Sequence, residues 1–366
     1  MIPGVSDATT APGRVLTRGD IVVLAGVTIG VALAGITRYV DAGAVIPFVC
    51  AAVAVALLAS LVGRSVEQLG DRFGAGATGV LQSGLGNLPE LFIGFFALQA
   101  GLVRVVQAAI IGSILSNALL VLGLAFLVGG LKHGTQKFSS SRARVTSVLM
   151  VLAVAALVLP SLASYTHTPA AKHEDMLSIA VAVILLLVFA CSLPVSLARG
   201  RDGAVDPAHP TEAPRWPTWL AVTLLALASG GAALVSDWFV HALEPAIDSL
   251  GISQAFAGLV VVAIAGNAIE NVVGIQLAFK NQADYALSVI INSPLQIALV
   301  LAPALVLLSF LTSTTLTLVF APMLVVAVAI TVLTVALVVL DGESNWLEGV
   351  TLIALYAIIA AAFWWG

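Results

Sequence analysis

The sequence predicts an all-α protein that crosses a membrane about eleven times, with two five-helix repeats of inverted topology and one extra N-terminal helix. Two observations predict the membrane fold. Sixty per cent of the 366 residues are hydrophobic and only 9% are charged, whereas a soluble domain carries about 25% charged residues. The apolar residues also form runs of about 20, the length of helix that crosses a bilayer. An internal repeat, described below, predicts how the helices are arranged.

The composition excludes several classes of protein. A chain with a mean hydropathy of +1.10 cannot cover a water-facing surface, which excludes a soluble globular enzyme. Its pI of 5.7 offers no basic surface, so we expect no nucleic acid as a partner. The apolar runs lack the alternation of transmembrane β-strands. The sequence contains no phosphate-binding loop, cofactor motif or nucleophile arrangement, so we expect neither enzymatic activity nor a cofactor.

Eleven apolar runs are long enough to be spans. A polar segment, 1–20, precedes the first run and has no signal-peptide pattern, so we interpret it as a tail. A proline-rich segment, 199–217, separates the sixth run from the seventh and is interpreted as a linker. In chain order the predicted spans are 21–37, 43–62, 73–99, 105–128, 145–163, 176–198, 218–236, 252–279, 285–310, 316–340 and 346–364.

The distribution of Lys and Arg predicts the orientation. If the N-terminus is cytoplasmic and the spans alternate, all of the 15 Lys and Arg fall on the cytoplasmic side except Arg38, Arg104 and Lys172. This is the positive-inside bias of membrane proteins. It places the tail and the linker in the cytoplasm and the C-terminus outside. The Ala- and Val-rich composition and the missing targeting segment favour a prokaryotic plasma (inner) membrane.

An internal repeat with an offset of 180 residues runs through the chain. The pattern Gly-Asn-x-x-Glu occurs at 86–90 and again at 266–270, and without a gap Ser113 then aligns with Ser293. Asn, Glu and Ser are rare in these spans, so the matches carry weight. Five spans is an odd number, so a second copy enters the membrane from the opposite side, as in the inverted repeats of secondary transporters. The chain then divides into a cytoplasmic tail (1–20), an extra helix (21–42), a first repeat (43–198), a linker (199–217) and a second repeat (218–366).

Two glutamates, Glu90 and Glu270, are the only charged residues well inside the predicted spans. A charge in the bilayer core is costly, and such residues usually face a polar cavity. Gly and Asn precede each glutamate, and Pro89 precedes Glu90 directly. Because Pro and Gly weaken a helix, we expect the helix to open there and to free carbonyl oxygens beside the carboxylate.

Two further spans offer oxygen groups near these glutamates. Carboxylates, amides, hydroxyls and free carbonyls are hard ligands that suit Ca²⁺, whereas soft metals call for thiolate or imidazole. Mg²⁺, Mn²⁺ and Na⁺ could use the same groups, so the residues alone leave the ion open. The proposed metal ligands are Glu90, Glu270, Asn87, Asn267, Ser113, Asn117, Ser293 and Gln296.

These motifs resemble the two α-repeats of the Ca²⁺/H⁺ antiporter (CAX) family of the cation/Ca²⁺ exchanger superfamily. The likeness runs from about residue 62 to residue 308. The resemblance implies that Glu90 and Glu270 bind Ca²⁺ or protons, and that Glu67 is the acidic residue near the cytoplasmic mouth. The segments that carry it are 63–67, 86–91, 112–117, 266–270, 293–298 and 302–303.

The sequence also departs from the family pattern. Asn271 stands where the family usually has His after the second glutamate, and Asn292 replaces a usual Gly. The acidic segment that often joins the two halves is reduced to three acidic residues among prolines. These departures affect the expected coupling and pH dependence and leave the pair of glutamates intact.

The sequence therefore predicts a secondary transporter that exchanges Ca²⁺ for H⁺ by alternating access, with a lipid bilayer as its surroundings. One alternative is Na⁺-coupled exchange of Ca²⁺ or another divalent cation. Ile297 argues against it, because it aligns with Asn117 and offers no ligand for a separate Na⁺. A passive cation channel is a further alternative, although broken helices in an inverted repeat fit a carrier better.

Overall fold

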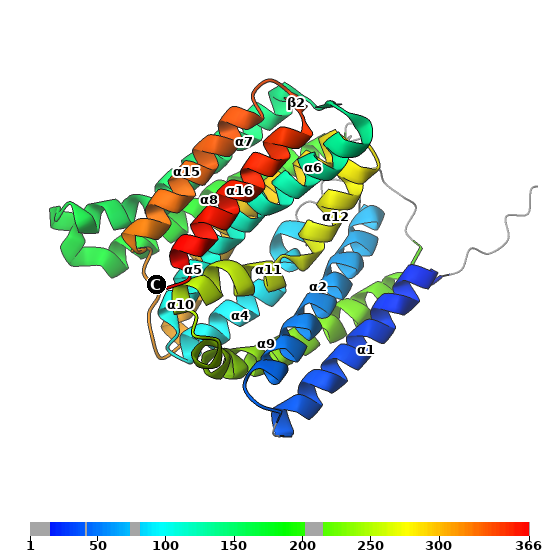
Figure 1. Ribbon diagram of the computed structural model, residues 1–366, viewed down its shortest axis with the longest axis horizontal. Coiled ribbons are helices and arrows are strands. Elements are labelled where there is room, and N and C mark those ends of the chain that lie inside the picture. The colour runs from blue at the N-terminus through cyan, green and yellow to red at the C-terminus, as the bar shows by residue number, and fades with distance from the viewer. Residues whose placement is uncertain (1–14, 41, 74–80, 202–214, 366) are drawn as a thin grey trace, which may run out of the picture.

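The computed structural model describes residues 15–40, 42–73, 81–201 and 215–365, and almost all of them lie in helices (Figure 1). The strands of this part of the chain are two residues long and pair antiparallel, β1 (Gln136–Lys137) with β2 (Glu343–Ser344). The predicted all-α fold class is confirmed.

The described residues up to Arg201 form seven α-helices with two π-helical turns and one 3₁₀ turn among them. They are α1 (Arg18–Tyr39), α2 (Val45–Phe73), the π turn η1 (Gln82–Gly86), α4 (Leu88–Gln99), α5 (Val103–Leu115), the π turn η2 (Ser116–Val121), α6 (Leu122–His133), α7 (Ser140–Tyr165), the 3₁₀ turn η3 (Pro169–His173) and α8 (Glu174–Arg201).

The part after the linker continues in the same manner. It contains α9 (Thr218–Leu250), α10 (Gln254–Phe256), the π turn η4 (Ala257–Val262), α11 (Ala263–Gly266), α12 (Ala268–Phe279), α13 (Ala283–Gln296), the π turn η5 (Ile297–Leu301), α14 (Ala302–Leu308), the 3₁₀ turn η6 (Ser309–Leu311), α15 (Pro322–Val338) and α16 (Trp346–Phe363).

Several of these helices are long and apolar enough to cross a membrane. Within the described residues there are 8 such helices, or 9 if the bent pair Gln254–Gly266 and Asn271–Phe279 is one span. Two shorter apolar helices, α4 and α15, coincide with further predicted spans. The membrane-spanning fold is confirmed, and the total of eleven spans stays a prediction. Residues 74–80 of the third predicted span lie outside the described residues.

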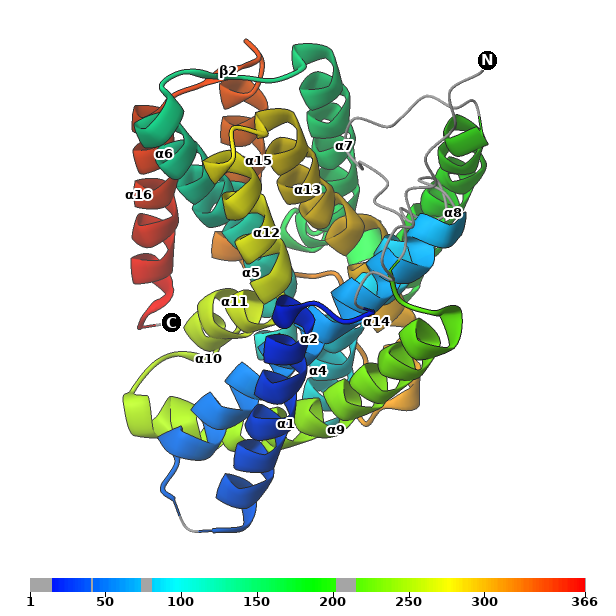
Figure 2. The same ribbon diagram turned by 90° about the vertical axis from the view of Figure 1, so that its right-hand side faces the viewer.

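The long helices form two groups with short helices between them (Figures 1 and 2). In one group α2 packs against α1 and α9, and in the other α6 packs against α16 and α7 against α15. The short helices α4, α5, α11 and α12 lie between the two groups. Both halves of the chain contribute to one continuous hydrophobic core.

Two glycines let the halves of the chain approach each other closely in this centre. A Cβ atom at Gly112 of α5 would stand 2.2 Å from the carbonyl oxygen of Leu259 in η4. A Cβ atom at Gly258 would stand 2.3 Å from the carbonyl oxygen of Val105. Only glycine fits such backbone-to-backbone contacts, so α5 of the first half and η4 of the second are in direct contact.

Several local features recur 180 residues apart. α4 and α12 have 12 residues each and begin after asparagines with nearly the same backbone angles, φ −91° and ψ 16° at Asn87 and φ −92° and ψ 21° at Asn267. Each helix then leads to a turn with a positive φ, 79° at Gly101 and 61° at Asn281. The sequence repeat therefore has a counterpart in the local backbone geometry.

α9 is longer than predicted. The expected seventh span ends at residue 236, but α9 continues to Leu250 and is 33 residues long. An acidic residue just after the predicted end of the span has two partners. Asp237 lies 4.0 Å from Arg38 of α1 and 3.3 Å from His241, one turn further along α9. Asp237, His241 and Glu244, which follow the predicted end of the span at residue 236, therefore lie inside α9.

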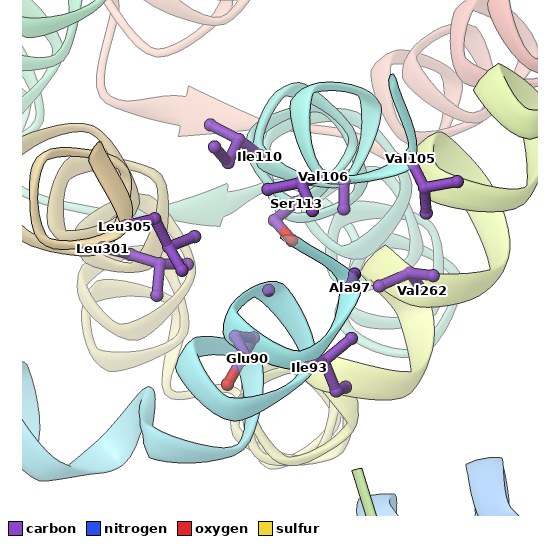
Figure 3. Close-up of a pocket in the computed structure, with 12 residues that line it drawn as sticks. Glu90, Ile93, Ala97, Val105, Val106, Ile110, Ser113, Val262, Leu301 and Leu305 are labelled. Atoms are coloured by element: carbon purple, nitrogen blue, oxygen red, sulfur yellow. The ribbon is translucent and has the colours of Figure 1, made fainter. Parts of the chain in front are cut away.

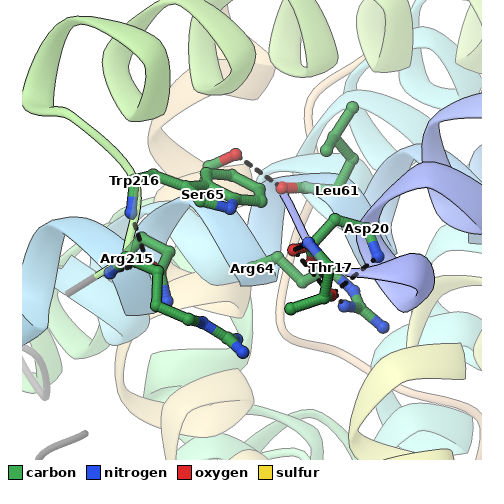
Figure 4. Close-up of polar contacts among 8 residues, drawn as sticks. Thr17, Asp20, Leu61, Arg64, Ser65, Arg215 and Trp216 are labelled. Carbon is green, nitrogen blue, oxygen red and sulfur yellow. Dashed lines mark hydrogen bonds and ion pairs between the residues drawn. The ribbon is translucent and has the colours of Figure 1, made fainter. Parts of the chain in front are cut away.

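The last turns of α2 hold the starts of α1 and α9 in place (Figure 4). Arg64 donates to the buried carboxylate of Asp20 at 3.0 Å. The side-chain oxygen of Gln68 accepts from the backbone N–H groups of Arg215, at 2.8 Å, and of Trp216, at 3.0 Å. Trp216 is 1% exposed. The described end of the interhelical linker is therefore anchored in a second hydrophobic cluster.

Candidate ion-binding site

Each half of the chain contains a helix break at an asparagine that precedes a glutamate by three residues. Gly86 ends η1 and Gly266 ends α11, and the asparagine that follows each of them leaves the helical conformation. The predicted break of the helix at these motifs is confirmed, and the freed carbonyl oxygens beside the carboxylate stay a prediction. The break lies at the asparagine and not at Pro89, which sits in the first turn of α4, where a missing N–H costs nothing.

Asn267 is the centre of a buried hydrogen-bond network. Its Oδ1 accepts from Asn117 Nδ2 at 2.8 Å and from Ser293 Oγ at 3.3 Å. Its Nδ2 donates to Ser113 Oγ and to the carbonyl oxygen of Ala263, both at 2.9 Å. Asn267 is 0% exposed. The network joins α11 and α13 of the second half to α5 and η2 of the first.

Asn87 has a simpler environment. Its Nδ2 donates to Gln296 Oε1 at 3.3 Å, and its side chain is 6% exposed. The equivalent of Asn117 on this side is Ile297, which is buried and cannot donate a hydrogen bond. Six of the eight predicted ligands are therefore drawn together in two groups, one around Asn267 and one at Asn87.

Glu90 lies in the first turn of α4 and is 9% exposed. Its side chain packs directly against Gly266 of the opposite half. A Cβ atom at Gly266 would stand 2.6 Å from Glu90 Cγ and 3.2 Å from Cδ. The glutamate side chain of the first motif thus packs against the helix break of the second motif. The position of a helix N-terminus also favours its negative charge.

A pocket extends from Glu90 along α4 and α5 (Figure 3). It has about 380 Å³ of empty space, which includes the part open to solvent. Glu90 and Ser113 are its polar lining residues, and aliphatic side chains such as Ile93, Val106 and Leu305 form the rest. Its lining also includes Ala97 and Val105, which lie near the two ends of the turn between α4 and α5.

The site contains an oxygen that is available to a cation. Asn117 is 0% exposed, and its Oδ1 accepts no hydrogen bond from any group in the described part of the chain. A buried amide oxygen without a donor is costly, and a cation would satisfy it. Among the same residues, no cluster of three or more His, Cys, Asp or Glu side chains is placed to hold a metal ion. A cation here would therefore depend on neutral oxygens beside carboxylates.

Comparison with known proteins places the chain in a family. The sequence profile of the family described as sodium/calcium exchanger protein matches residues 43–198 and 220–365. The chain belongs to this family. It is 36% identical over 335 residues to a Ca²⁺/H⁺ antiporter of Synechocystis sp., covering 86% of this chain and 90% of the relative. It is 37% identical over 343 residues to the Ca²⁺/H⁺ antiporter ChaA of Bacillus subtilis, covering 92% and 97%.

Solved structures agree with this assignment. The structure of native YfkE matches with a TM-score of 0.80 at 35% identity, over 93% of this chain and 99% of that chain. The H⁺/Ca²⁺ exchanger CAX matches with a TM-score of 0.73 at 18% identity, over 95% of this chain and 92% of that chain, which shows a shared fold. The resemblance drawn from the sequence motifs is confirmed.

Two more predicted site residues lie on α12 and α2. Glu270 lies in the first turn of α12, equivalent to Glu90 in α4, but its side chain lies outside the described residues. Glu67 is exposed on α2 between Arg64 and Arg72. Its predicted place at a cytoplasmic mouth stays a prediction.

One proline and one glycine near the candidate site have surroundings that the sequence pattern does not show. Pro294 lies inside α13, and the helix loosens after it in the π turn η5. Gly266 was seen only as a helix weakener, whereas it also makes room for Glu90. The sequence does contain a signal for this contact, because glycine precedes asparagine in both motifs. It does not show that the partner of Gly266 is the glutamate of the other motif.

Proposed function

We propose that this protein is a secondary active transporter that exchanges Ca²⁺ for H⁺ across a membrane by alternating access. The observation that carries the proposal is the buried carboxyl group of Glu90, seated on Gly266 beside an asparagine network contributed by both halves. The names of the similar proteins, Ca²⁺/H⁺ antiporters of a cyanobacterium and of a Bacillus, support the choice of ions.

We further propose an eleven-span architecture with two inverted five-helix repeats, 43–198 and 218–366, after one extra helix. The two segments matched by the family profile and the local geometry that recurs after 180 residues support the repeat. The Lys and Arg distribution supports a cytoplasmic N-terminus and an outer C-terminus. We place the protein in a prokaryotic plasma membrane, acting as a transporter and not as an enzyme.

The cycle follows from charge balance. Two ionised glutamates, Glu90 and Glu270, would carry two negative charges into a medium of low dielectric constant, which is costly without partners. One Ca²⁺ neutralises this charge, and so do two protons. Only the neutral, occupied states should therefore cross readily between inward and outward orientations, and Ca²⁺ and protons compete for one site.

The neighbouring residues have different tasks in this scheme. Asn117 would offer its free Oδ1 to the ion, and the hydroxyl groups of Ser113 and Ser293 would add oxygens. Asn267 has both its oxygen and its nitrogen engaged, so we assign it to positioning these groups. Asn87 and Gln296 would complete the site on the opposite side.

The buried aliphatic side chain of Ile297 favours protons over Na⁺ as the coupling ion. It occupies the position equivalent to Asn117, where a separate Na⁺ would need an oxygen ligand. Na⁺-coupled exchange remains the second candidate. A channel would need no counter-ion on the opposite side of the membrane, and that difference separates it from both exchangers.

The test is uptake of ⁴⁵Ca²⁺ by proteoliposomes that contain the purified protein. We expect an imposed pH gradient to drive uptake and an imposed Na⁺ gradient to drive little uptake. The control is the Glu90→Gln variant in the same lipids. Uptake driven by Na⁺ alone would replace this proposal with the second candidate, and uptake without any counter-ion would indicate a channel.

The pH dependence of Ca²⁺ binding gives a second readout. A protonated glutamate is neutral and cannot balance Ca²⁺, so acid weakens binding and alkali restores it. Because two carboxyl groups lose protons before the ion binds well, apparent affinity should rise by up to about a hundredfold per pH unit below their titration range. A flat pH response with strong competition by Na⁺ would reject proton coupling.

A further inference from the structure

A strip of polar side chains runs along α13. Its members follow one another at intervals of four residues, so they share one slowly winding face of the helix that is about 18 Å long. Each is partly exposed, whereas Leu287 and Ile291 beside them are buried. The strip consists of Asp284, Ser288, Asn292 and Gln296.

The polarity of the strip indicates that it faces water and not lipid. Amide and carboxylate groups in contact with the hydrocarbon core are costly, and polar residues in a span face the protein interior or a water-filled cavity. Asn292 Nδ2 donates to Ser288 Oγ at 3.4 Å, which links the middle of the strip. A partly exposed row of this length fits the wall of an aqueous crevice.

The two ends of the strip have different surroundings. At one end Gln296 accepts the hydrogen bond from Asn87 of the ion-binding site. At the other end Asp284 Oδ1 accepts from the backbone N–H of Ser139 at 2.7 Å. A second pocket, with about 250 Å³ of empty space, lies there between α7 and α13, and its lining includes Ser288 and Arg142. The strip thus connects the site with a pocket at the end where the predicted cytoplasmic Lys and Arg gather.

The equivalent face of α5 is closed. The positions 180 residues earlier are Arg104, Ala108, Gly112 and Ser116, so the middle of that face has no polar side chain. Gly112 is in contact with the backbone of Leu259, whose Cα atom would stand 2.5 Å from a Cβ atom at this position. The polar strip is therefore a property of the second half alone.

We propose that this strip is the cytoplasmic access route by which a partly hydrated divalent cation reaches the ion-binding site. The inference rests on the proposed function for its cargo. Asp284 offsets the positive charge of Arg142 at the mouth of the route. The oxygens of Ser288 and Asn292 then replace water molecules that the cation loses, and Gln296 delivers it to the site.

Cysteine accessibility tests the route without reference to transport. The native Cys50 and Cys191 are replaced by Ala, and Ser288→Cys, Asn292→Cys and the control Val289→Cys are made one at a time. Val289 is also partly exposed but lies on an adjacent, apolar face of α13. Inside-out membrane vesicles are treated with a charged, membrane-impermeant thiosulfonate, which reacts with a thiolate in water.

We expect Ser288→Cys and Asn292→Cys to react at least about tenfold faster than Val289→Cys, because only thiols in water ionise and meet the reagent. Ca²⁺ should slow the reaction of Asn292→Cys. Equal, slow labelling of all three would overturn the route. Equally fast labelling of Ala108→Cys, at the matching position of α5, would also overturn it.

Transport kinetics give an independent readout. Asn292→Leu should lower the maximal rate of Ca²⁺ uptake about fivefold, the change that corresponds to about 1 kcal/mol of lost oxygen ligation. Equilibrium Ca²⁺ binding should stay unchanged, and Asn292→Ser should restore most of the rate. An unchanged rate in Asn292→Leu would contradict the route. Failure of Ca²⁺/H⁺ exchange in the unmodified protein would overturn the proposed function and leave the labelling result standing.

Discussion

The helix breaks of the two halves share a backbone and differ in what holds them. Asn267 is fully buried and makes four side-chain hydrogen bonds to three helices and a π turn. Asn87 has nearly the same φ and ψ but makes one side-chain hydrogen bond, at 3.3 Å, among the described groups. Equal backbone geometry therefore does not mean equal rigidity. We expect the second break, which has more side-chain hydrogen bonds, to be the more rigid of the two.

The largest expected effect concerns what the two halves share. Glu90→Gln and Glu270→Gln should each abolish Ca²⁺/H⁺ exchange, because glutamine keeps the shape of the side chain but cannot balance Ca²⁺ or carry a proton. The measurement is ⁴⁵Ca²⁺ uptake under a pH gradient, with size-exclusion profiles as the check on folding. Exchange at the unmodified rate in either variant would refute the two-carboxylate model. A defect in one variant alone would show that the asymmetry extends to the glutamates.

The contact between the halves should be nearly as sensitive. Gly266→Ala places a Cβ atom 2.6 Å from Glu90 Cγ, so either the carboxyl group or the helix break must move. We expect the uptake rate to fall at least about tenfold. Such a fall corresponds to an activation free energy that the misplaced group raises by about 1.4 kcal/mol. The matched control is Gly230→Ala in α9, where no described atom lies within 4 Å of the added Cβ. A Gly266→Ala variant as active as this control would show that Glu90 does not need its present position.

Much of this arrangement follows from the sequence, and the reasons for the rest are physical. Span positions follow from runs of apolar residues, and the breaks follow from Gly-Asn pairs in spans where Asn is rare. The full length of α9 does not follow, because the charge of Asp237 is compensated by Arg38 of α1, a helix far away in the sequence. The seat of Glu90 on Gly266 is also a contact between distant segments, and no local pattern encodes it.

The comparison also predicts a difference in stability. Asn267→Ala removes four hydrogen bonds to partners in a buried site, so we expect a loss of about 2–4 kcal/mol. Asn87→Ala removes one long hydrogen bond and should cost about 1 kcal/mol or less. Thermal unfolding of the purified variants in one detergent compares the two. Equal melting temperatures would show that the two breaks are held equally firmly, contrary to the hydrogen-bond pattern.

The smallest expected effect concerns two amides, one from each half, that we propose as ligands of the ion. Asn117 Oδ1 is buried without a described donor, whereas Gln296 Oε1 already accepts from Asn87. Asn117→Ala should therefore weaken apparent Ca²⁺ affinity about tenfold and Gln296→Ala about threefold, since a free ligand oxygen is worth more than one that must first exchange a partner. Neither variant should leak Ca²⁺ without a counter-ion, because both keep the two glutamates that balance charge. Uptake measured against Ca²⁺ concentration gives both affinities.

Asn117→Asp serves as the comparison, because it keeps an oxygen at the same place. If Gln296→Ala proves the more damaging of the two, the ion lies on the side of Asn87, and the rigid break of the second half serves only to hold the framework around it.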